Sequence, residues 1–330
     1  MNPLTHLTSA CRLVALCLTA LLALQPITVL ANDVTPVIVS YLLDDSNDDG
    51  PIVLHPDAGT HAAFPLQSTP GALPFGYYRY LPVDFTLDAR KPFPLILFLH
   101  GLGEKGDGTT NLNKVLANGP PKMIERGIDF PAIVLTPQVT ISDWQRQRDG
   151  IDIPGDLHTL VAYYKNNFNV DPERIYVTGL SLGGGGAWNY TRLYSDEVAA
   201  VVPICGVGTA GANMDQLADL GVWAFHSVDD GVVASRNSAR NINRVAGTSL
   251  DQPNGVMANY PNDGNDHIVS RVNDTWVWQP GRYNGQGNTR YTIFPDGAHN
   301  SWTRAYNENG GLDTPMWEWL FSQRKSLATQ

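Results

Sequence analysis

Residues 174–183, RIYVTGLSLG, decide the fold that this chain is expected to adopt. The run Arg174–Thr178 is rich in β-branched and aromatic residues and predicts a buried strand, and Leu182–Tyr194 is expected to form a helix after it. Between them lies Gly179-Leu180-Ser181-Leu182-Gly183, whose glycines allow a sharp turn that lifts the serine hydroxyl clear of the backbone. A strand, a glycine-bounded turn and a helix in direct succession predict a serine presented at the edge of a sheet.

The same alternation of strand and helix patterns continues on both sides of this turn. Continuous apolar runs at Pro94–Leu99 and Ala132–Pro137 predict strands that are covered on both faces, and Gly76–Phe85 alternates enough to form an edge strand. Further strands are expected at Ala199–Ile204, Val222–His226 and Arg290–Phe294, with helices at Asp156–Phe168, near Ser235–Val245 and at Gly311–Phe321. This order predicts an α/β fold with a mostly parallel sheet, helices on both faces and ligand binding beyond the carboxyl ends of the strands.

The bulk composition is that of a globular protein without a nucleic-acid-binding face. The 330 residues carry a net charge of −10, and no run of Lys and Arg marks a surface for phosphates, so that no nucleic acid is expected as a partner. No linker or low-complexity stretch divides the chain, which favours one large α/β domain over two small ones.

The first 31 residues predict an export signal. Arg12 and the amino terminus precede the apolar run Leu13–Leu24, and Val29-Leu30-Ala31 offers a cleavage site. The run is too short to span a bilayer comfortably, which disfavours a retained membrane anchor. We therefore expect a secreted or periplasmic protein in which residues 32–75 form an N-terminal extension and residues 76–330 the catalytic domain.

Cysteine and histidine usage predicts neither a disulfide nor a metal site. Of the three cysteines, Cys11 and Cys17 lie in the expected signal, so that the mature chain would keep Cys205 alone. No Cys/His cluster has the spacing of metal ligands.

A serine hydroxyl is a weak nucleophile and needs a base that is itself oriented by an acid. In a sheet of this kind the expected chain order is serine, acid, histidine. Three histidines follow Ser181. His299 comes just after the last expected strand, in a loop that can reach the serine, whereas His267 has no expected strand before it. His226 precedes every candidate acid, and we expect it to make a structural hydrogen bond.

The acid is expected in the loop that follows the strand Val222–His226. Asp229 and Asp230 both lie in that loop. One of the two carboxylates is expected to orient the base and the other to serve as a turn residue or helix cap. Spacing alone does not separate them.

Hydrolysis also needs N–H donors for the oxyanion that develops in the transition state, each worth about 3–4 kcal/mol. The residue after the nucleophile, Leu182, is expected to supply one of them. Leu102 is the expected second donor, because Gly101 and Gly103 on either side of it let the backbone bend after the Pro94–Leu99 strand.

Several ordered motifs resemble those of one known family. They are residues 98–107 (FLHGLGEKGD), 118–121 (NGPP), 170–176 (VDPERIY), 203–206 (PICG), 224–226 (AFH) and 300–302 (NSW). Together, from about Gly76 to Arg324, they are similar to the phospholipase/carboxylesterase-type α/β-hydrolases, which border on the feruloyl and acetyl carbohydrate esterases and the polyhydroxybutyrate depolymerases. The resemblance implies an α/β-hydrolase fold and no cofactor. In such relatives the acid lies four residues beyond the strand-end histidine, which selects Asp230 over Asp229.

The chain departs from the family pattern at two positions near the expected site. The usual His-Gly at the strand end is His226-Ser227 here, and we expect this change to shift the acid loop slightly. The residue after the double glycine is often bulky in the family but is Gly185 here, which is expected to leave the site roomier.

The largest departure is Ser249–Asn288, a connection much longer than usual before the last strand. It is rich in Asn, Asp and Gly and carries Trp276 and Trp278. One interpretation is a lid or a platform on which these aromatics stack against sugar; the other is a surface hairpin that buries its own aromatics. Trp302, three residues beyond the candidate base, is a third expected contact with substrate.

These features together predict an exported serine esterase. Ser181 attacks the ester, His299 takes and returns the proton, Asp230 holds the imidazole, and the Leu102 and Leu182 amides bind the oxyanion. The expected substrate is an acyl or feruloyl ester of carbohydrate, either a small molecule or a polymer. A short-chain carboxylesterase or polyester depolymerase is the next alternative, and a non-catalytic secreted binding protein with a hydrolase fold is an alternative from another class.

Overall fold

A computed structural model describes residues 51–70, 73–209, 214–247, 267–272, 275–280 and 288–325. The chain divides into two compact units, Met1–Val39 and Ser40–Gln330, and every described residue belongs to the second unit. The expected export signal therefore lies outside the described residues. So does the part of the N-terminal extension before residue 51.

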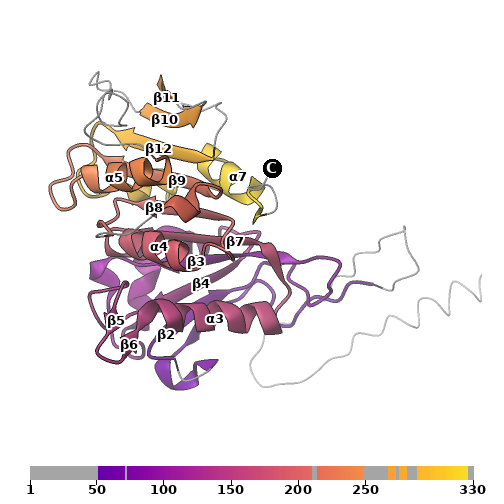
Figure 1. The fold of residues 1–330 in the computed structure, drawn as a ribbon. Helices are drawn as coiled ribbons and strands as arrows, with labels where there is room; N and C mark the ends of the chain where they lie inside the picture. Colours follow the sequence, from indigo (N-terminus) through magenta and orange to yellow (C-terminus); the bar gives the residue numbers. More distant parts are fainter. Residues whose placement is uncertain are drawn as a thin grey trace, which may run out of the picture. The chain divides into compact units, whose positions relative to one another are not determined.

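A large sheet runs through this unit (Figure 1). Its strands are β1 His61–Phe64, β2 Gly76–Tyr80, β3 Phe93–Leu99, β4 Ile133–Gln138, β7 Val170–Leu180, β8 Ala200–Ile204, β9 Gly221–Ser227, β10 His267–Val272, β11 Thr275–Pro280 and β12 Thr289–Phe294. Within the described residues the order across the sheet is β1-β2-β4-β3-β7-β8-β9-β12-β10-β11. The neighbours from β4 to β12 are parallel, whereas the two strands at each end pair antiparallel. The expected mostly parallel sheet is confirmed.

The central strands are apolar along their whole length because both of their faces are covered. All seven residues of β3 and all six of β4 are buried. A strand that faces water on one side alternates polar with apolar residues, and a strand between two layers of helices does not. This difference is why the runs at 94–99 and 132–137 could be recognised in the sequence.

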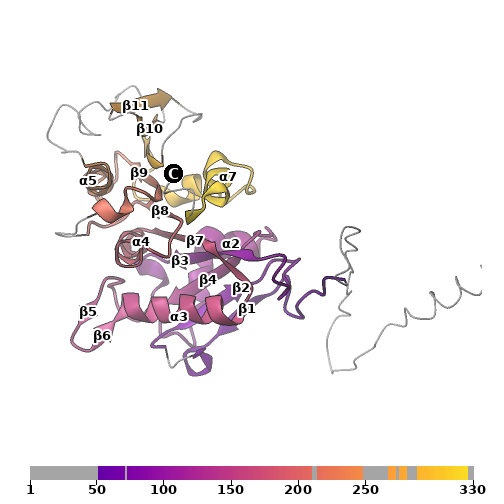
Figure 2. The ribbon, with the colours of Figure 1, turned by 45° about the vertical axis from the view of Figure 1, so that its right-hand side comes forward.

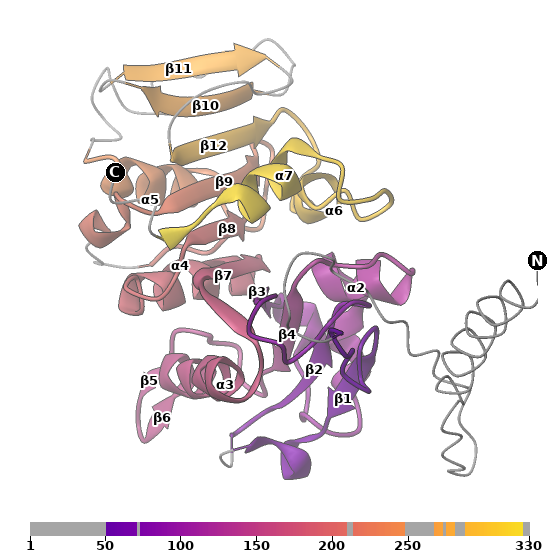
Figure 3. The same cartoon turned by 90° about the vertical axis from the view of Figure 1, so that its right-hand side faces the viewer.

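Helices cover both faces of the sheet. They are α2 Gly119–Glu125, α3 Ile153–Asn167, α4 Leu182–Leu193, α5 Arg236–Val245, α6 Trp302–Ala305 and α7 Pro315–Ser322. Figure 3 shows α3, α4 and α5 on one face and α2, α6 and α7 on the other, and Figure 2 shows α5 and α7 on opposite sides of β9. The short elements are the 3-10 helices η1 Leu66–Ser68, η3 Leu102–Glu104, η4 Leu112–Ala117 and η5 Asp215–Leu217, and the two-stranded ribbon β5 Gln147–Arg148 with β6 Ile151–Asp152.

Each face of the sheet has its own apolar cluster. Under α3 and α4 it contains Trp144, Tyr164 and Trp188, all almost completely buried. Under α2 and α7 it contains Phe130 and Trp317, whose rings meet edge to face with centroids 5.2 Å apart. The two clusters fix the sheet between its helices and hold the loops at its carboxyl edge in place.

The alternation in Gly76–Phe85 predicted an edge strand, and this prediction is wrong. Strand β1 pairs antiparallel outside β2, and the Phe64 ring stacks on Tyr77 at a centroid distance of 4.9 Å. Four residues of HAAF are too few for alternation to be visible in the sequence. The sheet thus includes His61–Phe64, which lie within the expected N-terminal extension, residues 32–75.

The long connection before the last strand contributes a hairpin to the sheet. Strand β10 pairs antiparallel with β12, with His267 opposite Ile293, and β11 pairs antiparallel with β10. Trp276 and Trp278 belong to β11, opposite Arg271 and Val269. Their side chains lie outside what the structure describes, as do residues 248–266 and 281–287.

Among the described residues, none of the helices is both long enough and apolar enough to cross a bilayer.

Candidate active site

Ser181 stands between β7 and α4 in a conformation that few residues adopt. Its φ and ψ are 54° and −117°, which projects the side chain out of the turn at the carboxyl edge of the sheet. The turn is tight enough that a Cβ on Gly183 would lie 2.0 Å from the Leu99 carbonyl oxygen, and one on Gly184 would lie 2.6 Å from the Ile204 oxygen. The glycines at the start of α4 are therefore required by the close approach of this helix to β3 and β8.

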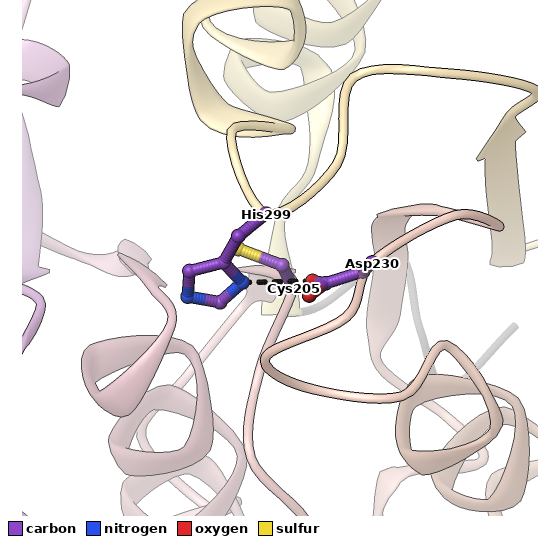
Figure 4. A group of neighbouring side chains, drawn as sticks. All are labelled: Cys205, Asp230 and His299. Carbon is purple, nitrogen blue, oxygen red and sulfur yellow. Dashed lines mark hydrogen bonds and ion pairs between the residues drawn. The ribbon is translucent and has the colours of Figure 1, made fainter.

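The structure brings Ser181, His299 and Asp230 together from three separate loops. Ser181 Oγ lies 2.8 Å from His299 Nε2, and His299 Nδ1 lies 2.8 Å from Asp230 Oδ2. The three loops follow β7, β12 and β9, whose carboxyl ends lie at one edge of the sheet. Figure 4 shows the His299 ring pointing at the Asp230 carboxylate. A chain of hydrogen bonds thus links the serine to a buried acid, as nucleophilic catalysis by serine requires.

Asp230 is held by donors on both of its oxygens. Oδ1 accepts the N–H groups of Val232 and Val233 at 2.8 and 2.9 Å. Oδ2 accepts from His299 and also faces His226 Nε2 at 3.1 Å. Burial alone would raise the pKa of this carboxyl, but the hydrogen bonds from His299 and the two amides outweigh burial and place the pKa below its usual value. The acid is therefore ionised and fixed in position.

Asp229 and Asp230 have different partners. The Asp229 carboxylate accepts the N–H of Ala298 at 2.9 Å, directly before His299 in the chain. Asp229 thus holds the backbone of the histidine loop, whereas Asp230 contacts the imidazole itself. The geometry separates two carboxylates that spacing left open.

His226 makes the structural hydrogen bonds expected of it, and one of them reaches the site. Its Nε2 lies 2.8 Å from the Val233 carbonyl and 3.1 Å from Asp230, so that this nitrogen carries the proton. The Ser238 hydroxyl lies 2.8 Å from Nδ1. Burial lowers the pKa of His226, which keeps the ring neutral beside the acid.

Both departures from the family pattern have a structural counterpart. The Ser227 hydroxyl lies 2.9 Å from the Ser301 hydroxyl and so joins the end of β9 to the histidine loop. The expectation of a roomier site at Gly185 is wrong: a Cβ there would come within 2.3 Å of Val207 Cγ2 and 3.1 Å of Gln145 Nε2. Val207 and Gln145 therefore occupy the space beside Gly185.

His100 orients the loop that carries Leu102. Its Nδ1 donates to the Gly101 carbonyl at 2.6 Å, and its Nε2 accepts the Val139 N–H at 3.2 Å, which fixes the tautomer. Burial lowers the pKa of His100 to about 4, so the ring is neutral. In a trans peptide the C=O and the next N–H point in opposite directions. The Leu102 amide therefore points away from the imidazole.

Leu102 and Leu182 each begin a helix, η3 and α4, so that their N–H groups have no partner within that helix. Gly101 lies against the nucleophile, since a Cβ there would be 3.7 Å from Ser181 Cβ. The two amides that are expected to donate to the oxyanion therefore flank the serine turn.

A cavity of about 540 Å³ opens above the serine. Its lining residues are Gly101, Leu102, Gly103, Glu104, Lys114, Ala117, Asn118, Leu180, Ser181, Val232, His299 and Trp302. Trp302 lies edge-on to the His299 ring, with centroids 5.5 Å apart. Its Nε1 donates to Asn118 Oδ1 at 3.0 Å, and the Asn118 amide in turn bonds to the buried Glu104. This polar chain orients the indole that forms one wall of the cavity.

Asn118 and Glu104 were missed as site residues although both lie in motifs that carry the family resemblance. Glu104 is the last residue of η3 and Asn118 follows η4, and nothing in their spacing in the sequence shows that they meet. The expected contact Trp302 does line the cavity, whereas the side chains of Trp276 and Trp278 lie outside the description.

Cys205 lies behind the His299–Asp230 pair, as Figure 4 shows. The thiol, the carboxylate and the imidazole offer ligand atoms within 4.8 Å of one another. Burial raises the pKa of the thiol to about 12, so it is protonated, and the other two groups are already bonded to each other. This donor set does not fit a resident metal ion, which requires a thiolate and free ligands.

The chain matches no protein-family model. Among solved structures it is similar to a thermostable esterase, at 25% identity and a TM-score of 0.54 over 80% of this chain. The match spans 63% of that esterase's length. Lower TM-scores relate it to an acetyl xylan esterase from Aspergillus awamori (0.44, 14% identity, 74% of this chain and 94% of that one) and to a feruloyl esterase module from Clostridium thermocellum complexed with sinapinate (0.40, 17% identity, 61% and 76%).

Three observations point to the same fold. They are the strand order, the chain order of serine, acid and histidine, and the match to the thermostable esterase. The chain has the α/β-hydrolase fold.

Proposed function

We propose that the protein is a serine carboxylic-ester hydrolase that acts through an acyl-enzyme intermediate. One observation carries the proposal: Ser181 Oγ and Asp230 Oδ2 each lie 2.8 Å from opposite nitrogens of the His299 ring, and Ser181 and His299 line an open cavity. A non-catalytic binding protein with this fold has no need of such an arrangement. The positive φ at Ser181, which costs about 1–3 kcal/mol, also favours a reacting serine over a structural one.

Acylation follows from this geometry. His299 Nε2 takes the Ser181 proton while Oγ attacks the ester carbonyl, and Asp230 stabilises the imidazolium that forms. The N–H groups of Leu102 and Leu182 donate to the oxyanion. His299 then gives the proton to the leaving alkoxide, which departs as the alcohol and leaves the acyl group on Ser181.

Deacylation repeats these steps with water as the nucleophile. His299 takes a proton from water, the hydroxide adds to the acyl carbonyl, and the collapse of this second oxyanion returns the proton to Ser181 Oγ. The acid product is released. Every proton transfer uses His299 Nε2. The chain's own residues therefore supply all the groups that the reaction uses, and the proposed mechanism includes no cofactor.

For the substrate we propose an acyl or feruloyl ester of carbohydrate. The lining includes the apolar side chains of Leu180, Val232 and Trp302 together with the polar side chains of Lys114 and Asn118. Such a mixture suits an acyl or aryl group held beside a hydroxylated alcohol. The ordered motifs resemble those of the phospholipase/carboxylesterase-type hydrolases, which border on the carbohydrate esterases, and this resemblance favours the same class. A short-chain carboxylesterase or polyester depolymerase is the alternative, and the signal-like N-terminus leads us to propose export.

A substrate panel tests this proposal. Wild-type protein and Ser181→Ala are assayed on p-nitrophenyl acetate, methyl ferulate, acetylated xylan and a polyester film. We expect hydrolysis of the first three, and a loss in the variant of about 10⁴-fold or more, because the triad acts as a unit.

Two results would contradict the proposal at different levels. Turnover of the polyester film alone would move the substrate to the alternative class. Equal activity in Ser181→Ala with an unchanged circular dichroism spectrum would remove the mechanism itself.

A further inference from the structure

A second cavity, of about 310 Å³, lies between α5 and the loop that follows β8. It is lined by Gly208, Thr209, Asn237, Arg240, Asn241 and Arg244. None of these residues takes part in the proposed chemistry. The size is at the lower end of the range for small-molecule sites, about 300–1,000 Å³.

The helix presents a stripe of hydrogen-bond donors to this cavity. Asn237, Arg240, Asn241 and Arg244 are spaced i, i+3, i+4 and i+7, which places them on one face of α5. A helix that packs on a sheet normally has apolar residues at that spacing on its buried face. Here the apolar residues Ala239, Ile242 and Val245 form a separate buried stripe, so that the donor stripe is additional to the packing face.

One of these donors is buried without a partner. Asn241 is 1% exposed, and its Oδ1 accepts from the Thr209 hydroxyl at 3.3 Å. Its Nδ2 has no acceptor among the residues that the structure describes. Buried polar groups are almost always paired, and an exception indicates a missing ligand or water. An Nδ2–H₂ group can only donate, so the missing partner must be an acceptor.

The charge of the cavity is positive. Arg240 and Arg244 line it, and none of its six lining residues is acidic. Arg244 Nη1 donates to the Thr209 carbonyl at 2.9 Å, which holds this guanidinium at the wall. Asp215 lies on η5, which packs against α5, but it is not among the lining residues. The chain as a whole has a net charge of −10, so this positively charged lining is opposite in sign to the protein's overall charge.

We propose that this cavity binds an oxyanion, a carboxylate or sulfate group. The anion would accept from Asn241 Nδ2 and from the Arg240 and Arg244 guanidinium groups, whose planar fork suits such oxygens.

The cavity adjoins the catalytic loops. The Val207 N–H donates to the Ser181 carbonyl at 3.3 Å, and Gly208, one residue further, lines the cavity. On the other side, α5 begins directly after the Asp230 loop. The two cavities share no lining residue, so the anion belongs either to an acidic group on an ester substrate that is long enough to reach both or to a free small molecule. The first source rests on the proposed function; the binding itself does not.

The binding experiment uses D-glucuronate and sulfate as anions and D-glucose as the neutral control, at constant ionic strength, with isothermal titration calorimetry and melting temperature as readouts. We expect glucuronate and sulfate, but not glucose, to bind the wild-type protein and raise its melting temperature. Arg240→Gln should weaken binding by about tenfold or more, since a charged hydrogen bond is lost. Arg240 is exposed, so this change leaves the fold intact.

Arg236→Gln is the matched control, because Arg236 is an exposed arginine on the same helix that does not line the cavity. Asn241→Asp tests the buried donor by placing a carboxylate in its position, and should abolish binding. No binding above that of glucose, or equal weakening by Arg236→Gln and Arg240→Gln, would overturn the proposal.

A kinetic arm identifies the source of the anion. The KM values of acetylated methyl glucuronide and acetylated methyl glucoside are compared in wild type and Arg240→Gln. If the anion is part of the substrate, the variant raises KM for the acidic ester alone. If both esters are unaffected while glucuronate still binds, the ligand is a free anion. Because the calorimetric arm needs no turnover, a failed esterase assay would leave the anion site standing, and a failed titration would leave the esterase standing.

Discussion

Two regions at the carboxyl edge of the sheet treat their polar groups in opposite ways. At the triad, the Asp230 carboxylate accepts from two backbone amides and from two histidines, so that each oxygen is satisfied before any substrate arrives. In the cavity on α5, the buried Asn241 Nδ2 has no acceptor within the described residues. A group that performs chemistry gains from being held in one position in advance. A group that binds a ligand, by contrast, must have a donor that is not yet paired within the protein.

The largest effect is expected at the acid. Asp230→Asn removes the charge that stabilises the imidazolium and reverses the preference for the reactive tautomer, so kcat should fall by about 10³–10⁴. Asp229→Asn is the matched control. It weakens one hydrogen bond, to Ala298 N–H, and should cost about tenfold or less. The kcat values of the two variants are compared on p-nitrophenyl acetate. Equal losses of kcat would contradict the assignment of Asp230, and not Asp229, as the acid that orients His299.

A smaller effect is expected at His100, which touches no reacting atom. His100→Gln loses the donor to the Gly101 carbonyl and should lower kcat by about 10–100-fold, less than the loss of a complete oxyanion donor. His100→Asn keeps a donor near the Nδ1 position and should recover most of the rate. If both variants lose kcat equally while KM stays constant, the role of the Gly101 bond would be disproved, because packing alone would explain the loss.

The stability of the protein should depend on these buried histidines. Burial lowers the folded-state pKa of His100 to about 4 from the ordinary 6.5, and it lowers the pKa of His226 as well. The unfolded chain then binds protons more readily, so the stabilisation is complete above pH 6.5 and is lost as the pH falls towards 4. Each histidine contributes a slope of at most about 1.4 kcal/mol per pH unit. Urea denaturation from pH 7 to 4.5 measures it.

His100→Gln supplies the control for this titration, since it removes one of the two groups. Its unfolding free energy should fall less steeply with acid than that of the wild type. A wild-type free energy that stays constant over the same pH range would contradict the neutral, buried state of both rings.

The smallest effect is expected in the hairpin that extends the sheet. If Trp276 and Trp278 form a platform for sugar, Trp276→Ala and Trp278→Ala should raise KM for acetylated xylan by a few-fold, about 1 kcal/mol, and leave p-nitrophenyl acetate unchanged. If these residues are part of a core, both variants should lower the melting temperature and reduce turnover of every substrate alike. Measurements of both substrate classes and of the melting temperature decide between the two.

Much of the triad could be predicted because it depends on local order. Each member follows a strand, and the carboxyl ends of parallel strands meet at one edge, so Ser181 and His299 could be placed from the pattern alone. The choice between Asp229 and Asp230 depends on which of two adjacent side chains faces the imidazole. Spacing does not encode that direction, and the resemblance to a family supplied it.

Other features depend on contacts between distant segments and could not be predicted. Strand β1 is four residues long and is recognisable through its pairing with β2 and the stacking of Phe64 on Tyr77. The space at Gly185 is taken by Val207 and Gln145, which come from other loops. The donor stripe of α5 is visible in the sequence RNSARNINRV. The cavity that it lines could not be predicted, because that cavity forms only where the loop after β8 lies against α5.

The most direct test of the central claim is to find the atom that reacts. Wild-type protein is treated with diisopropyl fluorophosphate, and the modified peptide is mapped by mass spectrometry. The account predicts one phosphoryl group per chain, carried by Ser181, with labelling strongly slowed in His299→Ala and absent in Ser181→Ala. An adduct on another residue, or ester turnover that survives complete labelling of Ser181, would contradict it.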